Sequence, residues 1–207
     1  MLTDLVPLFV SVGDMHVTVF GGGPVALRKC KHFKGADITV VALEVIPEIR
    51  AIASEIIVSR AEDAMHLISR NDIVVAATND KELNDKIKDA ALLKGKHVNS
   101  AHGGGDILIP SVLERKGYAV AVSSLGAVPA FPPYVVEELD RFLDEKFDLM
   151  FDVISKIRDE CRNMWTQPLR SKFLRNVLHD PSVLAYVEEG KKGLAVERAK
   201  RMMEGAE

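Results

Sequence analysis

The feature that most constrains the fold is a glycine run that joins an apolar stretch to a helix-like one, in HVTVFGGGPVALRKC (residues 16–30). The run contains the pattern G-x-G-x-x-A at Gly21, Gly23 and Ala26. The first glycine permits a tight turn from strand to helix, the second lets backbone N–H groups approach a pyrophosphate, and the alanine allows the helix to pack closely on the strand. The start of a helix adds N–H groups that lack partners, and a proline costs little there. We therefore predict a dinucleotide-binding loop whose contacts come from Gly21, Gly22, Gly23, Pro24 and Val25.

Apolar runs alternate with helical stretches over the first half of the chain. Runs such as ITVVA and DIVVAAT are typical of strands that are buried on both faces of a parallel sheet. We also expect a strand at Pro7–Val12 (PLFVSV). After residue 110 one more strand, in GYAVAVSS, precedes a helical remainder. The sequence thus predicts an α/β fold, with a Rossmann-type NAD-binding domain over residues 1–110, a linking region over 111–145 and an α-helical C-terminal domain over 146–207.

Polar residues follow two of the predicted strands. Thr78, Asn79 and Asp80 end the run DIVVAATND, on the carboxyl edge where a doubly wound sheet binds its ligand. We expect them to contact the nucleotide, with the alternative that Asn79 and Asp80 only cap the next helix. Glu44 lies about 20 residues beyond the glycine loop, where an acid that binds the ribose is expected. No arginine stands at the tip of that strand, which favours NAD over NADP.

Composition excludes several classes of protein. A formal net charge of −3 over 207 residues gives no reason to expect binding to nucleic acid or to a membrane surface. The two cysteines have no partner motif, and the histidines show no ligand spacing, so we predict neither disulfide nor metal site. The apolar run near the N-terminus is too short to span a bilayer and lacks a preceding basic region. We expect a cytoplasmic protein.

Several segments, taken in order, carry a resemblance to a known family. The segments PLFVSVGDMHVTVFGGGPVALRK, DIVVAATND, HVN, ILIPSVLERKGYAVAVSSLGAVPA and VVEELDRFL resemble those of the precorrin-2 dehydrogenase family, which includes the dehydrogenase and ferrochelatase part of siroheme synthase. The resemblance implies NAD-dependent oxidation of precorrin-2 to sirohydrochlorin. It also implies a homodimer, with residues 111–145 as the dimerisation region. Some members insert ferrous iron as well, so ferrochelatase activity is an open alternative.

The segment VNSAHGGGDILIP (residues 98–110) departs from this family. Many members carry an aspartate three residues after the asparagine, implicated in both reactions, and here that position is His102. The resemblance makes His102 the candidate catalytic residue, as a general base or as a guide for a metal ion, while a third interpretation is that it only shapes the loop. The three glycines that follow precede no helix, so we interpret them as a flexible loop and not as a second phosphate site. The resemblance also places Asn99, Ser124 and Gly126 beside the tetrapyrrole.

Two further expectations concern the second half of the chain. Paired prolines in AFPPYVVEEL replace a basic stretch of the family and should delay the start of the next helix. The substrate carboxylates must then be met by other basic residues, of which the candidates are Arg28, Lys29, Arg115, Lys116 and Arg141. An alternative function is a regulatory module that binds NAD without catalysis. Replacing Gly21 by a bulky residue is expected to abolish NAD binding and to leave the fold intact.

Overall fold

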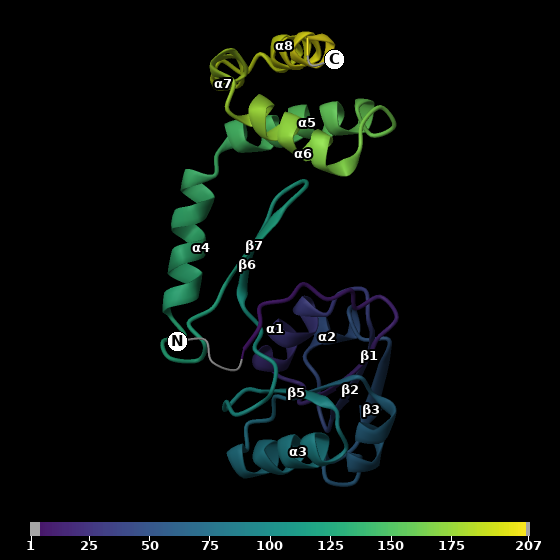
Figure 1. Cartoon of the computed structure of the whole chain (residues 1–207). Coiled ribbons are helices and arrows are strands. Elements are labelled where there is room, and N and C mark those ends of the chain that lie inside the picture. The colour runs from purple at the N-terminus through teal and green to yellow at the C-terminus, as the bar shows by residue number, and fades with distance from the viewer. Residues whose placement is uncertain (1–4, 206–207) are drawn as a thin grey trace. The chain divides into compact units, whose positions relative to one another are not determined.

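The computed structural model of the chain describes residues 5–205, which form two compact units that divide between Ile109 and Pro110. The first unit is built on a parallel sheet of five strands in the order β3-β2-β1-β4-β5 (Figure 1). This α/β architecture confirms the predicted fold class. The strands are β1 (His16–Phe20), β2 (Asp37–Ala42), β3 (Glu55–Val58), β4 (Ile73–Ala76) and β5 (His97–Ser100).

Helices cover both faces of this sheet, as the unbroken apolar strands predict. Val17 and Val19 of β1 face a cluster that includes Cys30 and Ile49, whereas Phe20 faces the opposite cluster with Ile87. Figure 1 shows α1 and α3 on opposite sides of the sheet. The helical elements of this unit are α1 (Pro24–His32), α2 (Pro47–Arg50), the 3-10 helix η1 (Met65–Arg70) and α3 (Lys81–Leu93).

The expected strand at Pro7–Val12 is not formed. The segment pairs with neither edge strand of the sheet, β3 or β5. Without a partner its backbone gains no ladder hydrogen bonds, and Leu8 and Phe9 are each 75% exposed. The strand-like composition of this run was therefore a misleading signal here.

The second unit joins a β-hairpin to five helices. Strands β6 (Ser111–Glu114) and β7 (Ala119–Val122) pair antiparallel. Residues from the last four helices form one hydrophobic cluster around Val153, Phe173 and Val183. The helices are α4 (Phe131–Phe142), α5 (Glu145–Glu160), α6 (Gln167–Leu178), α7 (Pro181–Glu188) and α8 (Lys192–Glu204).

The paired prolines do not delay α4. The helix begins at Phe131 and holds Pro132 and Pro133 in its first turn. The N–H groups of a first turn have no intrahelical partner, so proline removes nothing that the helix uses there. Pro168 and Pro181 lie in the first turns of α6 and α7 for the same reason. Of the helices within residues 5–205, none has both the length and the apolarity needed to cross a membrane.

Candidate functional site

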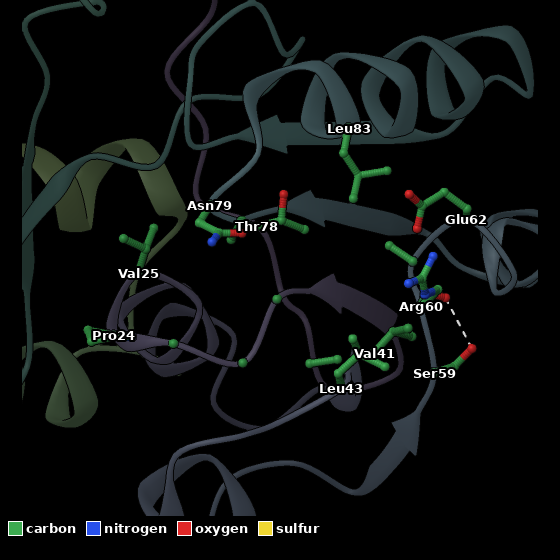
Figure 2. Close-up of a pocket in the computed structure, with 16 residues that line it drawn as sticks. Pro24, Val25, Val41, Leu43, Ser59, Arg60, Glu62, Thr78, Asn79 and Leu83 are labelled. Carbon is green, nitrogen blue, oxygen red and sulfur yellow. Dashed lines mark hydrogen bonds between the residues drawn. The ribbon is translucent and has the colours of Figure 1, made fainter.

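A cavity of about 550 Å³ opens at the carboxyl edge of the sheet, beside the glycine loop. Parallel α/β sheets bind ligands at this edge, where neighbouring strands lead to opposite faces. Figure 2 shows Thr78 and Asn79 on one side of the cavity and Leu43 and Ser59 on the other. Its lining residues come from the ends of β1 to β4 and the starts of α1 and α3: Gly21, Gly22, Gly23, Pro24, Val25, Val41, Ala42, Leu43, Ser59, Arg60, Ala61, Glu62, Ala77, Thr78, Asn79 and Leu83.

The three glycines of the loop have different neighbours. A Cβ on Gly21 would lie 2.3 Å from the carbonyl oxygen of Ala77, and its φ of +125° is a conformation that favours glycine. A Cβ on Gly22 would lie 1.9 Å from the carbonyl oxygen of Glu44. A Cβ on Gly23 would meet nothing within 4 Å. The first two glycines therefore serve the fold, and the third leaves space that a ligand can use.

Free donors face this space. The N–H groups of Gly22, Gly23 and Val25 make no hydrogen bond to another residue of the described range 5–205. They belong to the start of α1, where the helix dipole favours an anion. No acidic side chain lies in the first turn of α1. The loop thus offers the donors and the space that a pyrophosphate requires.

The far end of the cavity differs from the sequence-based expectation. Glu44 is exposed and does not line the cavity, whereas the preceding residue, Leu43, does. The polar groups at this end are Ser59, Arg60 and Glu62, which follow β3. Sequence reasoning missed them because it followed only the second strand. The available signal was the polar run SRAED directly after the strand EIIV.

The residues after β4 divide between the cavity and the helix that follows. Thr78 and Asn79 line the cavity. Asp80 instead caps α3, because its carboxylate accepts a hydrogen bond from the N–H of Leu83 at 3.1 Å. The structure therefore gives Asp80 the capping geometry and places the other two against the space for a ligand.

A buried amide joins this edge to His102. Asn84 of α3 is 0% exposed, and its Oδ1 accepts hydrogen bonds from the N–H and the hydroxyl of Thr78 at 3.0 and 2.8 Å. Its Nδ2 donates to the carbonyl oxygen of Thr78 at 3.0 Å and lies 2.8 Å from Nδ1 of His102. The link follows from register, because Ala76 pairs with Ser100 and the strands are parallel. Thr78 and His102 each stand two residues beyond that pair.

The glycine-rich loop after His102, which the sequence predicts to be flexible, is exposed at Gly103 and Gly104 and hydrogen-bonded to β5 at its end. Gly103 and Gly104 have φ values of +85° and +80°, and a Cβ on Gly105 would lie 2.2 Å from the carbonyl oxygen of Val98. Asp106 fastens the end of the loop to β5: its Oδ1 accepts from the N–H of Val98 at 2.6 Å. These glycines thus build a tight turn.

Asn99, Ser124 and Gly126 were expected beside the substrate. Asn99 is 4% exposed, donates to the carbonyl oxygen of Ile107 at 3.0 Å, and leaves its Oδ1 without a partner among residues 5–205. Ser124 and Gly126 belong to the second unit. There the hydroxyl of Ser124 accepts from the N–H of Val128 at 3.2 Å, and Gly126 has a φ of +84°.

Three of the five candidate basic residues are neutralised by acids of their own unit. Arg115 pairs with Asp140 and Asp148, Lys116 with Asp152, and Arg141 with Glu138. Arg28 and Lys29 of α1 form no ion pair within the described residues 5–205. These two are the better candidates for a carboxylate. Across the same range, no three His, Cys, Asp or Glu side chains gather as a metal site.

Comparisons with known proteins agree with this geometry. Residues 8–111 match a family model described as "Putative NAD(P)-binding". The chain is 27% identical over 195 residues to precorrin-2 dehydrogenase of Methanosarcina barkeri, an alignment that covers 87% of this chain and 85% of the relative. It is 31% identical over 152 residues to precorrin-2 dehydrogenase of Bacillus subtilis, covering 69% of this chain and 91% of the relative.

Longer proteins match as well. Siroheme synthase of Psychromonas ingrahamii is 28% identical over 201 residues, which cover 93% of this chain but 42% of that protein. Among solved structures, SirC, a precorrin-2 dehydrogenase, superposes with a TM-score of 0.74 at 24% identity, over 95% of this chain and 100% of SirC. The fold is shared over both units of the chain. The nucleotide-type cavity, the family model and the Bacillus relative together show that this chain belongs to the precorrin-2 dehydrogenase family.

Proposed function

We propose that the protein oxidises precorrin-2 to sirohydrochlorin with NAD as the hydride acceptor. The observation that carries the proposal is the glycine cavity at the carboxyl edge, in a chain that belongs to this family. A hydride leaves the reduced tetrapyrrole, a proton is released, and conjugation extends around the macrocycle. Nothing in the site favours the alternative of a regulatory module without catalysis.

The residues of the cavity suit a dinucleotide. The free N–H groups of Gly22, Gly23 and Val25 would hold the pyrophosphate, and the open space at Gly23 lets it approach the backbone. Thr78 and Asn79 would meet the half of the cofactor that carries the nicotinamide, which accepts the hydride when bound. We assign Pro24 to the pyrophosphate contact as well. Gly21 is the residue that makes the turn.

We propose NAD in preference to NADP. Glu62 lines the end of the cavity beyond β3, and a carboxylate there accepts a hydrogen bond from a ribose hydroxyl and repels a 2′-phosphate. Arg60 lines the same end and would attract that phosphate. Titrating the wild type, Glu62→Gln and Arg60→Ala with NAD⁺ and with NADP⁺ shows which cofactor this end of the cavity prefers. Tighter binding of NADP⁺ by the wild type would overturn the assignment.

His102 is our candidate for the catalytic residue, with Asn99, Ser124 and Gly126 on the substrate side. His102 is exposed and linked through Asn84 to the cavity residue Thr78, which supports its place beside the nicotinamide half. Asp80 and Glu44 are less well supported, since one caps a helix and the other lies outside the cavity wall.

The decisive experiment is an anaerobic assay with purified protein, precorrin-2 and NAD⁺, followed by the absorbance of NADH and of sirohydrochlorin. We expect both products in equal amounts. A protein that binds NAD⁺ but forms neither product would contradict the proposed reaction. Adding ferrous iron after oxidation tests the ferrochelatase alternative in the same cuvette.

We also propose a homodimer, with residues 111–145 as the dimerisation region. Three aromatic side chains of α4, Phe131, Tyr134 and Phe142, are more than half exposed, which is typical of a surface that is covered in an assembly. Sedimentation equilibrium should give twice the monomer mass of 22.8 kDa. A Phe142→Glu variant should shift the equilibrium toward the monomer, whereas Leu93→Glu, at an exposed apolar residue of the first unit, should not. A monomeric wild type would overturn the proposal.

A further inference from the structure

The side-chain amide of Asn84 can have only one orientation. Its oxygen receives the N–H of Thr78, and its nitrogen donates to the carbonyl oxygen of the same residue. Exchanging the two ends would set donor against donor and acceptor against acceptor. Because both partners are backbone groups, whose roles never change, the orientation does not depend on any side chain nearby.

This orientation decides which nitrogen of His102 carries the proton. The second hydrogen on Nδ2 of Asn84 points to Nδ1 of His102, at 2.8 Å. An N–H donor requires a lone pair as its partner, so Nδ1 is unprotonated and the proton of the neutral ring is on Nε2. Nε2 makes no hydrogen bond to any other residue in the described range 5–205, and the side chain is exposed. His102 therefore presents a free N–H donor to its surroundings.

We propose that Asn84 is a positioning residue that holds His102 as the Nε2–H tautomer, and that His102 acts as a hydrogen-bond donor to an acceptor group of the substrate. The second half of this statement rests on the proposed function. The acceptor class is a carboxylate or a carbonyl oxygen, and the tetrapyrrole substrate carries several carboxylates. A general base or a metal ligand would need a lone pair on the exposed nitrogen, and in this tautomer Nε2 has none. The site thus uses His102 to orient its substrate.

The tautomer is tested on the full chain without substrate or cofactor. Nitrogen-15 NMR of chains labelled at histidine distinguishes the two ring nitrogens, and the signals of His102 are identified by their loss in His102→Gln. We expect the Nε2–H pattern in the wild type. Asn84→Asp should convert it to the Nδ1–H pattern, because a carboxylate accepts where the amide donates. Thr78→Ala should leave it unchanged, since the backbone grip on Asn84 is kept.

Asn71 provides a matched control. It is another buried asparagine of the same unit, 6% exposed, and its Nδ2 donates to the carbonyl oxygen of Leu67. Asn71→Asp should leave the His102 signals where they are. An Nδ1–H pattern in the wild type would overturn the proposal even if Asn84→Asp does not fold. An unchanged Nε2–H pattern in folded Asn84→Asp would equally overturn it.

The donor role is tested by the anaerobic assay. Glutamine keeps an N–H donor but has no basic lone pair, so His102→Gln should stay within about threefold of the wild type, while His102→Ala should raise the KM for precorrin-2 about tenfold, the loss of about one hydrogen bond to a charged group. If His102→Gln is as impaired as His102→Ala, the donor role is wrong. If the wild type forms no NADH, the proposed function fails, and the NMR result still decides the tautomer.

Discussion

The glycine loop separates at the level of single residues into positions that serve the fold and a position that serves the ligand. Gly23→Ala adds a methyl group to open space and needs no unusual φ, so the free energy of unfolding should change by less than about 0.5 kcal/mol. The same methyl group stands where the pyrophosphate is expected, and the affinity for NAD⁺ should fall at least about tenfold. Calorimetric titration and urea unfolding measure the two quantities separately.

Gly21→Ala is the matched comparison, because the sequence-based expectation is that a bulky residue at this position leaves the fold intact. Its Cβ would lie 2.3 Å from the carbonyl oxygen of Ala77 at a φ of +125°. The strain and the overlap should cost about 3 kcal/mol of stability. A larger side chain at Gly21 should cost still more stability, so the loss of NAD binding and the loss of stability have to be measured separately there. If Gly21→Ala were as stable as Gly23→Ala, the separation of roles would not hold.

The buried thiol of Cys30 should make the free energy of unfolding depend on pH in the alkaline range. The side chain is fully buried beside Ala26 and Ile49, and burial raises the pKa of its thiol from 9.0 to about 11. The unfolded chain loses this proton first, so the contribution of the neutral thiol is fully present below pH 9 and is lost as the pH rises toward 11. Cys30→Ala should lose about 1 kcal/mol at neutral pH and decline less steeply between these values. Urea unfolding of both chains across this range measures the difference, and parallel curves would contradict it.

At the level of elements, the contribution of a helix cap to stability depends on how deeply the cap is buried. Asp180 begins α7: its Oδ1 accepts from the N–H groups of Ser182 and Val183, each at 3.0 Å, and both oxygens bind the guanidinium of Arg198. Only 9% of Asp180 is exposed. Removing this carboxylate leaves the cation and two N–H groups without a partner, so Asp180→Ala should cost about 3 kcal/mol. Asp144→Ala, at an exposed cap of α5, should cost about 1 kcal/mol.

The same carboxylate should make the second unit less stable at acid pH. The hydrogen bond from Arg198 is the main cause that lowers the pKa of Asp180, and the N–H groups of α7 add to it. Its contribution to stability is therefore present above its ordinary pKa of 3.8 and is lost as the pH falls below that value. Trp165, the only tryptophan of the chain, packs edge-on against Phe173 in this unit, so its fluorescence reports the transition. Acid unfolding that is identical in wild type and Asp180→Ala would contradict the assignment.

At the level of the whole molecule, local patterns gave most of the fold, and contacts between distant segments were the part that they could not give. The buried strands and the glycine turn can be predicted from short runs of sequence. Asn84 was missed because its partners Thr78 and His102 are 6 and 18 residues away and meet only through the sheet register. Arg60 and Glu62 were missed although a polar run follows β3, because placing that run beside the end of β2 requires the strand order.

At the level of the whole molecule, the chain divides after residue 109, and we expect the first unit to fold by itself. The two core clusters of the first unit draw on its residues alone, and every residue that lines the cavity lies between Gly21 and Leu83. A fragment of residues 1–109 therefore holds its own hydrophobic core, and we expect it to fold and to bind NAD⁺ within about threefold of the full chain. It lacks Ser124, Gly126 and the proposed dimerisation region, so it should not oxidise precorrin-2. Circular dichroism, calorimetric titration and the anaerobic assay test these three statements in turn. A folded fragment that fails to bind NAD⁺ would show that the second unit completes the cofactor site, whereas a fragment that oxidises precorrin-2 would remove Ser124 and Gly126 from the substrate site.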